Sequence, residues 1–84
     1  MTRLLYFAWV KEKVGKSSEE VALPSGVATV AELIAWLKTR GPEFANAFAR
    51  EDMIRAAIDR SHVRHDASIG AAREIAFFPP VTGG

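Results

Sequence analysis

The chain has 84 residues, of which 49% are hydrophobic, and its 11 Lys and Arg against 10 Asp and Glu give a formal net charge of +1. A chain of this length forms one small domain, which argues against a spacious internal active site, and its near-neutral charge argues against nucleic acid or an anionic membrane as a partner. The sequence contains no Cys, which excludes disulfides, thiolate metal sites and sulfur carried as a side-chain persulfide.

The N-terminal third predicts a strand followed by a short helix. Residues 3–8 are rich in strand-forming side chains, and alternation would place Leu5 and Phe7 on one face. Val10 and Val14 lie four residues apart in a charged stretch before Gly15, a pattern typical of a short helix. The apolar run here is too short to span a bilayer and lacks a signal-cleavage site, so we expect a cytoplasmic protein.

The middle of the chain predicts a second strand and two helices. Residues 19–23 fit a strand that pairs with the first and ends at a Pro-Ser-Gly turn. Thr29 and Glu32 form a capping box, which opens a helix with apolar residues at 30, 33, 34 and 37, closed by Arg40 and Gly41. A further short helix begins at Pro42 and places Phe44 and Phe48 in the core.

The C-terminal third predicts strands joined by an irregular segment. Residues 54–59 alternate as in a half-buried strand, and within the polar stretch 60–70 we expect Val63 and Ile69 to reach the core. Residues 74–78 predict the last strand, with Ile75 and Phe77 on one face and Ala76 and Phe78 on the other. The element order indicates an α+β domain with a mixed sheet packed on one main helix.

After this strand come Pro79, Pro80, Val81, Thr82, Gly83 and Gly84. Two prolines favour a stiff, extended stem, and two glycines can enter a channel too narrow for other residues. We therefore expect a folded domain at 1–78 and an extended tail at 79–84. An ionised α-carboxyl on Gly84 is a poor electrophile until it is activated; attack by sulfide on an acyl-adenylate would give a thiocarboxylate, and attack by an amine an isopeptide bond.

The segment 77–84, with weaker matches at 6–8, 13–15 and 57–59, resembles the small, sulfur-carrier subunits of molybdopterin synthase, a ubiquitin-like family with the β-grasp fold. The resemblance runs from Leu4 to Gly84. It implies that an E1-like enzyme uses ATP to adenylate Gly84 and that a sulfur-transfer enzyme then makes the thiocarboxylate, which supplies sulfur for the dithiolene of molybdopterin. This chain would act as a cosubstrate without catalytic side chains, a stably bound cofactor or a metal.

The same resemblance implies a heterotetramer with the large catalytic subunit, into which the tail inserts through Pro80, Val81, Thr82, Gly83 and Gly84. Since alternation puts Phe78 on the face away from the core, beside the tail, we expect it to be an exposed anchor for that subunit, together with Pro79 and Phe7. Three alternatives stay open: a carrier for thiazole synthesis or tRNA thiolation, a modifier joined to lysines, and an interaction module with an inert tail.

Other residues carry weaker signals. His62 and His65 lie near an acid but lack further ligands, which favours surface histidines over a metal site. Trp36 is expected at the rim of the core. The chain departs from the family at Ala72 and Arg73, where a Gly-Asp turn is usual, and at Asp59, where Asn is usual. The first departure suggests a different turn geometry. Arginines at 55, 60, 64 and 73 form either a basic patch for an acidic partner or, as we favour, a solvated face.

Overall fold

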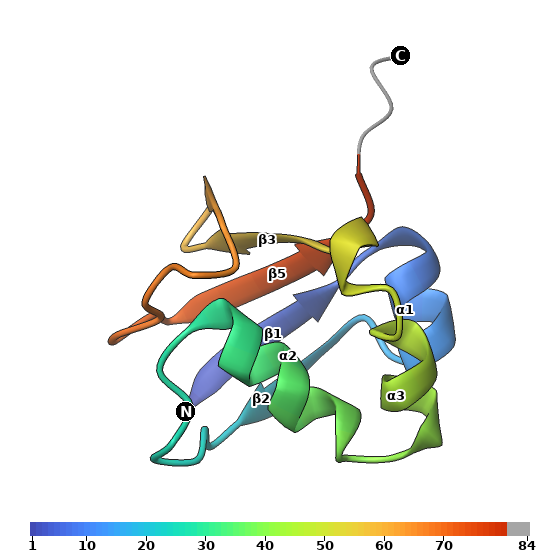
Figure 1. The fold of residues 1–84 in the computed structure, drawn as a ribbon, viewed down its shortest axis with the longest axis horizontal. Helices are drawn as coiled ribbons and strands as arrows, with labels where there is room; N and C mark the ends of the chain where they lie inside the picture. Colours follow the sequence, from blue (N-terminus) through green and yellow to red (C-terminus); the bar gives the residue numbers. More distant parts are fainter. Residues whose placement is uncertain (81–84) are drawn as a thin grey trace.

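The computed structural model describes residues 1–80 and shows a five-stranded mixed sheet in the order β2-β1-β5-β3-β4. The strands are β1 (Thr2–Tyr6), β2 (Ser18–Val21), β3 (Arg55–Ile58), β4 (Ser61–Val63) and β5 (Glu74–Phe78). β1 and β5 are parallel neighbours at the centre of the sheet, and the other pairs are antiparallel. Figure 1 shows β1 and β5 running side by side in the same direction. The predicted α+β architecture with a mixed sheet is confirmed.

The helices are α1 (Ala8–Val14), α2 (Val30–Lys38) and α3 (Pro42–Ala47), and a single 3-10 turn, η1 (Glu51–Met53), leads into β3. The predicted capping box is present, because the Thr29 hydroxyl accepts from the Glu32 N–H and the Glu32 carboxylate accepts from the Thr29 N–H. α2 ends at Lys38 with Thr39 as its C-cap, before the predicted stop at residues 40–41. Gly15, in the left-handed region, ends α1 as expected.

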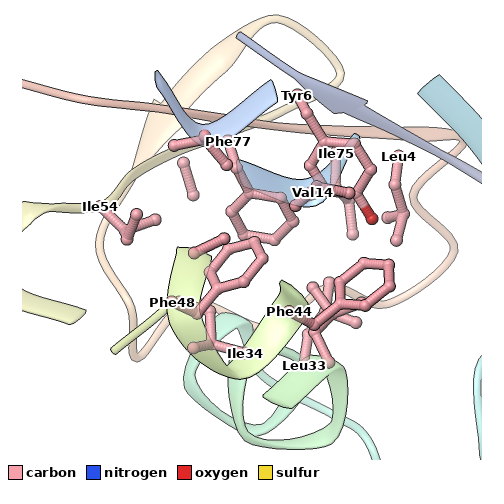
Figure 2. Packing of buried hydrophobic residues seen from close by; sticks show 14 of the residues in the cluster. Leu4, Tyr6, Val14, Leu33, Ile34, Phe44, Phe48, Ile54, Ile75 and Phe77 are labelled. Carbon is pink, nitrogen blue, oxygen red and sulfur yellow. The ribbon is translucent and has the colours of Figure 1, made fainter. Parts of the chain in front are cut away.

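The core lies between one face of the sheet and the three helices. Leu4, Tyr6, Ile75 and Phe77 supply the sheet side of it. The helix side includes Phe44 and Phe48, both buried as predicted. The Phe48 ring meets the Phe77 ring edge-on, with centroids 5.2 Å apart and an interplanar angle of 84°. Figure 2 shows these rings converging beneath β1 and β5. One main helix was expected, but α1 and α3 also cover this face, so three helical segments shield the central strands.

The first strand differs from its prediction in a way that matters for the site. β1 ends at Tyr6, and its buried residues are Leu4 and Tyr6, so Leu5 lies on the other face of the sheet. Phe7 is no longer in the strand: it is the N-cap of α1, because Ala8 adopts φ of 53° and turns the chain away from the sheet. The expectation that Leu5 and Phe7 share a strand face is therefore wrong.

Other expectations hold closely. The last strand has the predicted bounds, with Ile75 and Phe77 buried. Ile69 is buried, and Val63 packs against the core from β4. Trp36 packs at the rim of the core as expected, with the Arg40 guanidinium 5.3 Å from its ring centroid. No helix among residues 1–80 is long and apolar enough to cross a bilayer.

Candidate docking face and exit point of the C-terminal segment

The segment that sequence analysis singles out leaves the domain from the middle of the sheet. β5 is hydrogen-bonded to β1 on one side and β3 on the other, so both neighbours fix the direction in which it ends. Pro79 and Pro80 follow directly and are half-buried; neither has an N–H to extend a sheet ladder. The remaining tail residues, Val81 to Gly84, lie outside the described residues, so the predicted tail and its boundary stay predictions.

Phe78 lies on the sheet face opposite the core, as alternation predicts. Its cross-strand partner is Arg55 on β3, and the His62 ring of β4 packs against it, with centroids 5.1 Å apart and ring planes at 53°. Because of this contact Phe78 is half-buried, whereas sequence analysis expected an exposed side chain. The ring is thus held in place on the free face of the sheet.

The strand register brings four more residues to this face. Leu5, Ala76, Ala57 and His62 are successive partners across β1, β5, β3 and β4. With Phe78 they make up what we call the outer face. Its centre has only two methyl side chains, flanked by a Leu on one side and a His and Phe on the other. No helix of the described chain packs on this side, because the core cluster takes its sheet residues from the opposite face.

Sequence reasoning missed most of the outer face. Sequence analysis assigned His62 to an irregular polar segment. A short strand directly after the turn at Arg60 would have placed His62 opposite Ala57, as the structure has it. Its ring packs on Phe78, so it belongs with the outer face and not with a metal site. His65, the other histidine of this segment, makes a different contact: the His65 Nε2 lies 2.8 Å from the Ile54 carbonyl oxygen. Within residues 1–80, no three side chains of the ligand types are grouped as a metal site requires.

Phe7 lies at the end of the sheet where β5 stops. Its side chain is 48% exposed, and its N–H donates to the Phe77 carbonyl oxygen at 3.1 Å. Next to it, Trp9 and the exposed Met53 line a shallow groove between α1, α3 and η1. Phe7 therefore lies near the end of β5, but on the rim formed by α1 and not on a strand.

Asp59 supports the last strand from the β3–β4 turn. Asp59 and Arg60 both have positive φ, at 47° and 75°, and the Asp59 carboxylate accepts hydrogen bonds from the Arg73 and Glu74 N–H groups at 3.1 and 3.0 Å. The chain before β5 turns at Gly70, which has φ of 46°, so neither Ala72 nor Arg73 needs a left-handed conformation. Asp59 thereby fixes the start of the strand that ends at Phe78.

A mixed five-stranded sheet with its helices packed on one face and its last strand at the centre defines an α+β protein of the ubiquitin-like, β-grasp class. Solved structures agree with this class. SAMP1 from Haloferax volcanii superposes with a TM-score of 0.71 at 25% identity, covering 99% of this chain and 98% of that one. A structure from Pyrococcus furiosus described as a molybdopterin converting factor, subunit 1, superposes with a TM-score of 0.73 at 27% identity, covering 95% and 97%.

The chain belongs to the ThiS family, whose model matches residues 4–84. It is similar over the full length of both chains to the molybdopterin synthase sulfur carrier subunit of Escherichia coli K12, at 36% identity. The subunit of the same name from Dictyostelium discoideum is 33% identical over 98% of this chain and 94% of its own length. The predicted resemblance to sulfur carriers of this kind and the predicted β-grasp fold are confirmed.

Proposed function

We propose that this protein is the sulfur-carrier subunit of a molybdopterin synthase and that the carboxyl group of Gly84 carries the sulfur as a thiocarboxylate. The observation that carries the proposal is the family match, which extends through the final Gly-Gly pair beyond a fixed central strand. The relatives that match over nearly their whole length bear this name. The absence of Cys supports a terminal carrier, because no side-chain thiol is available to hold the sulfur.

The proposed chemistry needs activation before sulfur transfer. An E1-like enzyme joins the Gly84 carboxylate to AMP from ATP and releases pyrophosphate. Sulfide-level sulfur, supplied by a sulfur-transfer enzyme, then attacks the acyl carbon, AMP leaves, and the thiocarboxylate remains. In the synthase the sulfur attacks a carbon of the pterin precursor and displaces the oxygen bound there, and water then cleaves the acyl–sulfur bond, which leaves the sulfur on the pterin and restores the carboxylate. Since each of these steps uses groups of other proteins, this chain serves as a cosubstrate. We place this cycle in the cytoplasm.

The outer face supports a docking role for the residues around the tail. Phe78 is held on a sheet face that no described helix covers, and Phe7 and Pro79 flank the point where β5 ends. An apolar centre with an aromatic anchor is typical of a protein interface. We infer that the large catalytic subunit covers this face within a heterotetramer, while Pro80, Val81, Thr82, Gly83 and Gly84 enter its active site.

A second candidate function is favoured by one of the structural neighbours. SAMP1, also described as small archaeal modifier protein 1, is a modifier by name and has the same fold. A modifier would join Gly84 to lysine amines of target proteins and would appear as conjugates on a denaturing gel. A carrier for thiazole synthesis or tRNA thiolation would show the thiocarboxylate but would not support molybdopterin formation.

The experiment that tests the proposal is intact-mass measurement of the protein isolated from cells with an active pathway. We expect a fraction of the chains to have one oxygen replaced by sulfur. A variant lacking Gly84 is the matched control and should show no such species. A chain that appears only as the carboxylate, or only in lysine conjugates, would contradict the carrier proposal.

A further inference from the structure

Two exposed arginines, Arg55 and Arg64, lie beside the outer face. Arg55 is the cross-strand partner of Phe78 and is exposed. Arg64 directly follows β4, is exposed, and lines the same surface groove as Arg55. Within residues 1–80 neither guanidinium forms a salt bridge. In the described part of the chain, the end of the sheet from which the tail leaves therefore presents two cations without an ion pair next to Phe78.

The groove between these arginines has a volume of about 470 Å³. Its two acidic lining residues are already paired with other cations: Glu51 with Lys38, and Asp52 with Arg50 at 3.2 Å. These carboxylates are therefore not the partners of Arg55 and Arg64. The groove also contains the half-buried Val63, so it offers an apolar wall between charged rims.

The opposite end of the same sheet face carries acids next to its cations, since Arg3 and Arg73 line one surface depression with Glu20 and Glu74. Arg3 lies there with Glu20 on one side and Glu74 on the other as its cross-strand neighbours. Opposite charges on adjacent strands attract each other, so Arg3 has local compensation that Arg55 lacks. At the end where the tail emerges, Arg55 has Phe78 and no acid as its partner on β5.

We propose that the surface of the catalytic subunit that receives this face carries carboxylates positioned for Arg55 and Arg64, adjoining an apolar pocket for Phe78. The inference rests on the proposed function and adds the chemistry of the partner. A guanidinium recognises a carboxylate through two parallel hydrogen bonds, and rim charges chiefly accelerate and orient association. We thus assign charge recognition to this pair, for which sequence analysis favoured a solvated face and kept a basic patch for an acidic partner as the alternative.

The test compares binding of three proteins to the purified large catalytic subunit encoded in the same genome, over a series of salt concentrations. They are the wild-type chain, the double variant Arg55→Gln/Arg64→Gln, and the matched control Arg3→Gln. At low salt the double variant should bind about five- to twentyfold more weakly, mainly through slower association. Its affinity should also depend less on salt than that of the wild type, whereas the control should behave as the wild type.

The outcomes distinguish a failure of the charge recognition from a failure of the proposed function. If the wild type binds the subunit and the double variant matches it at every salt concentration, the charge recognition is wrong and the docking function stands. If Arg3→Gln weakens binding equally, the effect is one of net charge and the inference is again wrong. If the wild type does not bind the subunit at all, the proposed function fails and the inference fails with it.

Discussion

Glu19 joins three parts of the domain through one carboxylate. It accepts a hydrogen bond from the buried Tyr6 hydroxyl at 2.7 Å and two from the Arg40 guanidinium, at 2.7 and 3.0 Å. Burial alone would raise the pKa of Glu19, but the hydrogen bonds from Arg40 and Tyr6 and the charge of Arg40 hold it below its ordinary value of 4.5. Burial, aided by Glu19, raises the pKa of Tyr6. The network ties β1 and β2 to the segment after α2.

This network predicts a pH dependence of folding stability. Because the folded-state pKa of Glu19 is depressed, its contribution is fully present above its ordinary value of 4.5 and is lost as the pH falls through the folded value. Glu19→Gln should lower the free energy of unfolding at neutral pH by about 1–3 kcal/mol and should flatten the acid limb. Chemical denaturation across pH measures both effects. Glu20→Gln on the same strand is the control, and parallel acid limbs for wild type and Glu19→Gln would refute the assignment.

Phe78 carries the prediction for the outer face. Phe78→Ala should weaken binding to the catalytic subunit by about 2 kcal/mol or more, the scale of an interface anchor, because it removes the aromatic ring beside the tail. Calorimetric titration measures the affinity, and thermal unfolding of the free protein checks the fold. Met53→Ala, an exposed apolar residue on η1, is the control. Equal affinities for wild type and Phe78→Ala would show that the ring is not an anchor.

At the scale of elements, the N-terminus of α2 depends on Thr29. Its hydroxyl accepts the Glu32 N–H at 3.2 Å, and the Glu32 carboxylate also accepts from the Ala28 N–H at 2.9 Å. Thr29→Ala should destabilise the protein by about 1 kcal/mol, the usual cost of losing an N-cap. Ser25→Ala provides the control, since within residues 1–80 its hydroxyl has no hydrogen bond and is exposed. Denaturant midpoints compare the two, and an unchanged midpoint for Thr29→Ala would contradict the capping role.

Asp59 lies in the β3–β4 turn, at a position where the family usually has Asn, and its side chain is expected to stabilise the fold. Asp59→Ala should destabilise the protein by about 1–3 kcal/mol, because it removes the acceptor of the Arg73 and Glu74 N–H groups at the start of β5 and places Ala at positive φ. Asp59→Asn keeps an acceptor oxygen and tolerates that backbone, so it should retain most of the stability. Urea denaturation measures both, and equal losses would mean that the carboxylate charge, not the acceptor geometry, matters.

Sequence patterns predicted most elements of this fold because each signal is local. The capping box, the left-handed Gly15 and the alternation of residues 74–78 depend only on near neighbours, and all are confirmed. The strand order could not be predicted from these local signals, because β1 and β5 are parallel neighbours separated by most of the chain. The pairing of His62 with Ala57 is local, but it was missed because residues 60–70 were interpreted as an irregular polar stretch, so the extent of the outer face came from the structure.

Phe7 illustrates a second limit. Its residue type fits a strand, and only the left-handed conformation of Ala8, which the local sequence does not signal, moves it to the start of α1. The network around Glu19 is a third case, because Arg40 lies 21 residues away in sequence. Contacts of this range depend on how α2 and α3 pack beneath the sheet.

At the scale of the whole molecule, the two faces of the sheet differ in what packs on them. One face builds the core with three helices, and the other is left with a short apolar centre and a cationic end near Phe78. The central strand β5 contributes to both, since Phe77 is buried and Phe78 lies on the outer face. On the proposed function, this division would let one central strand both complete the core and support the docking of the partner subunit.

The central claim is that Gly84 delivers sulfur, and sulfur transfer in a single turnover tests it most directly. The protein would be prepared with a thiocarboxylate at Gly84 labelled with a heavy sulfur isotope and mixed with the large catalytic subunit and the pterin precursor. We predict that the carrier returns to the carboxylate mass while the label appears in the dithiolene product, with two carriers consumed for each dithiolene. Product that lacks the label, or a carrier that keeps its sulfur while bound to the subunit, would contradict the account.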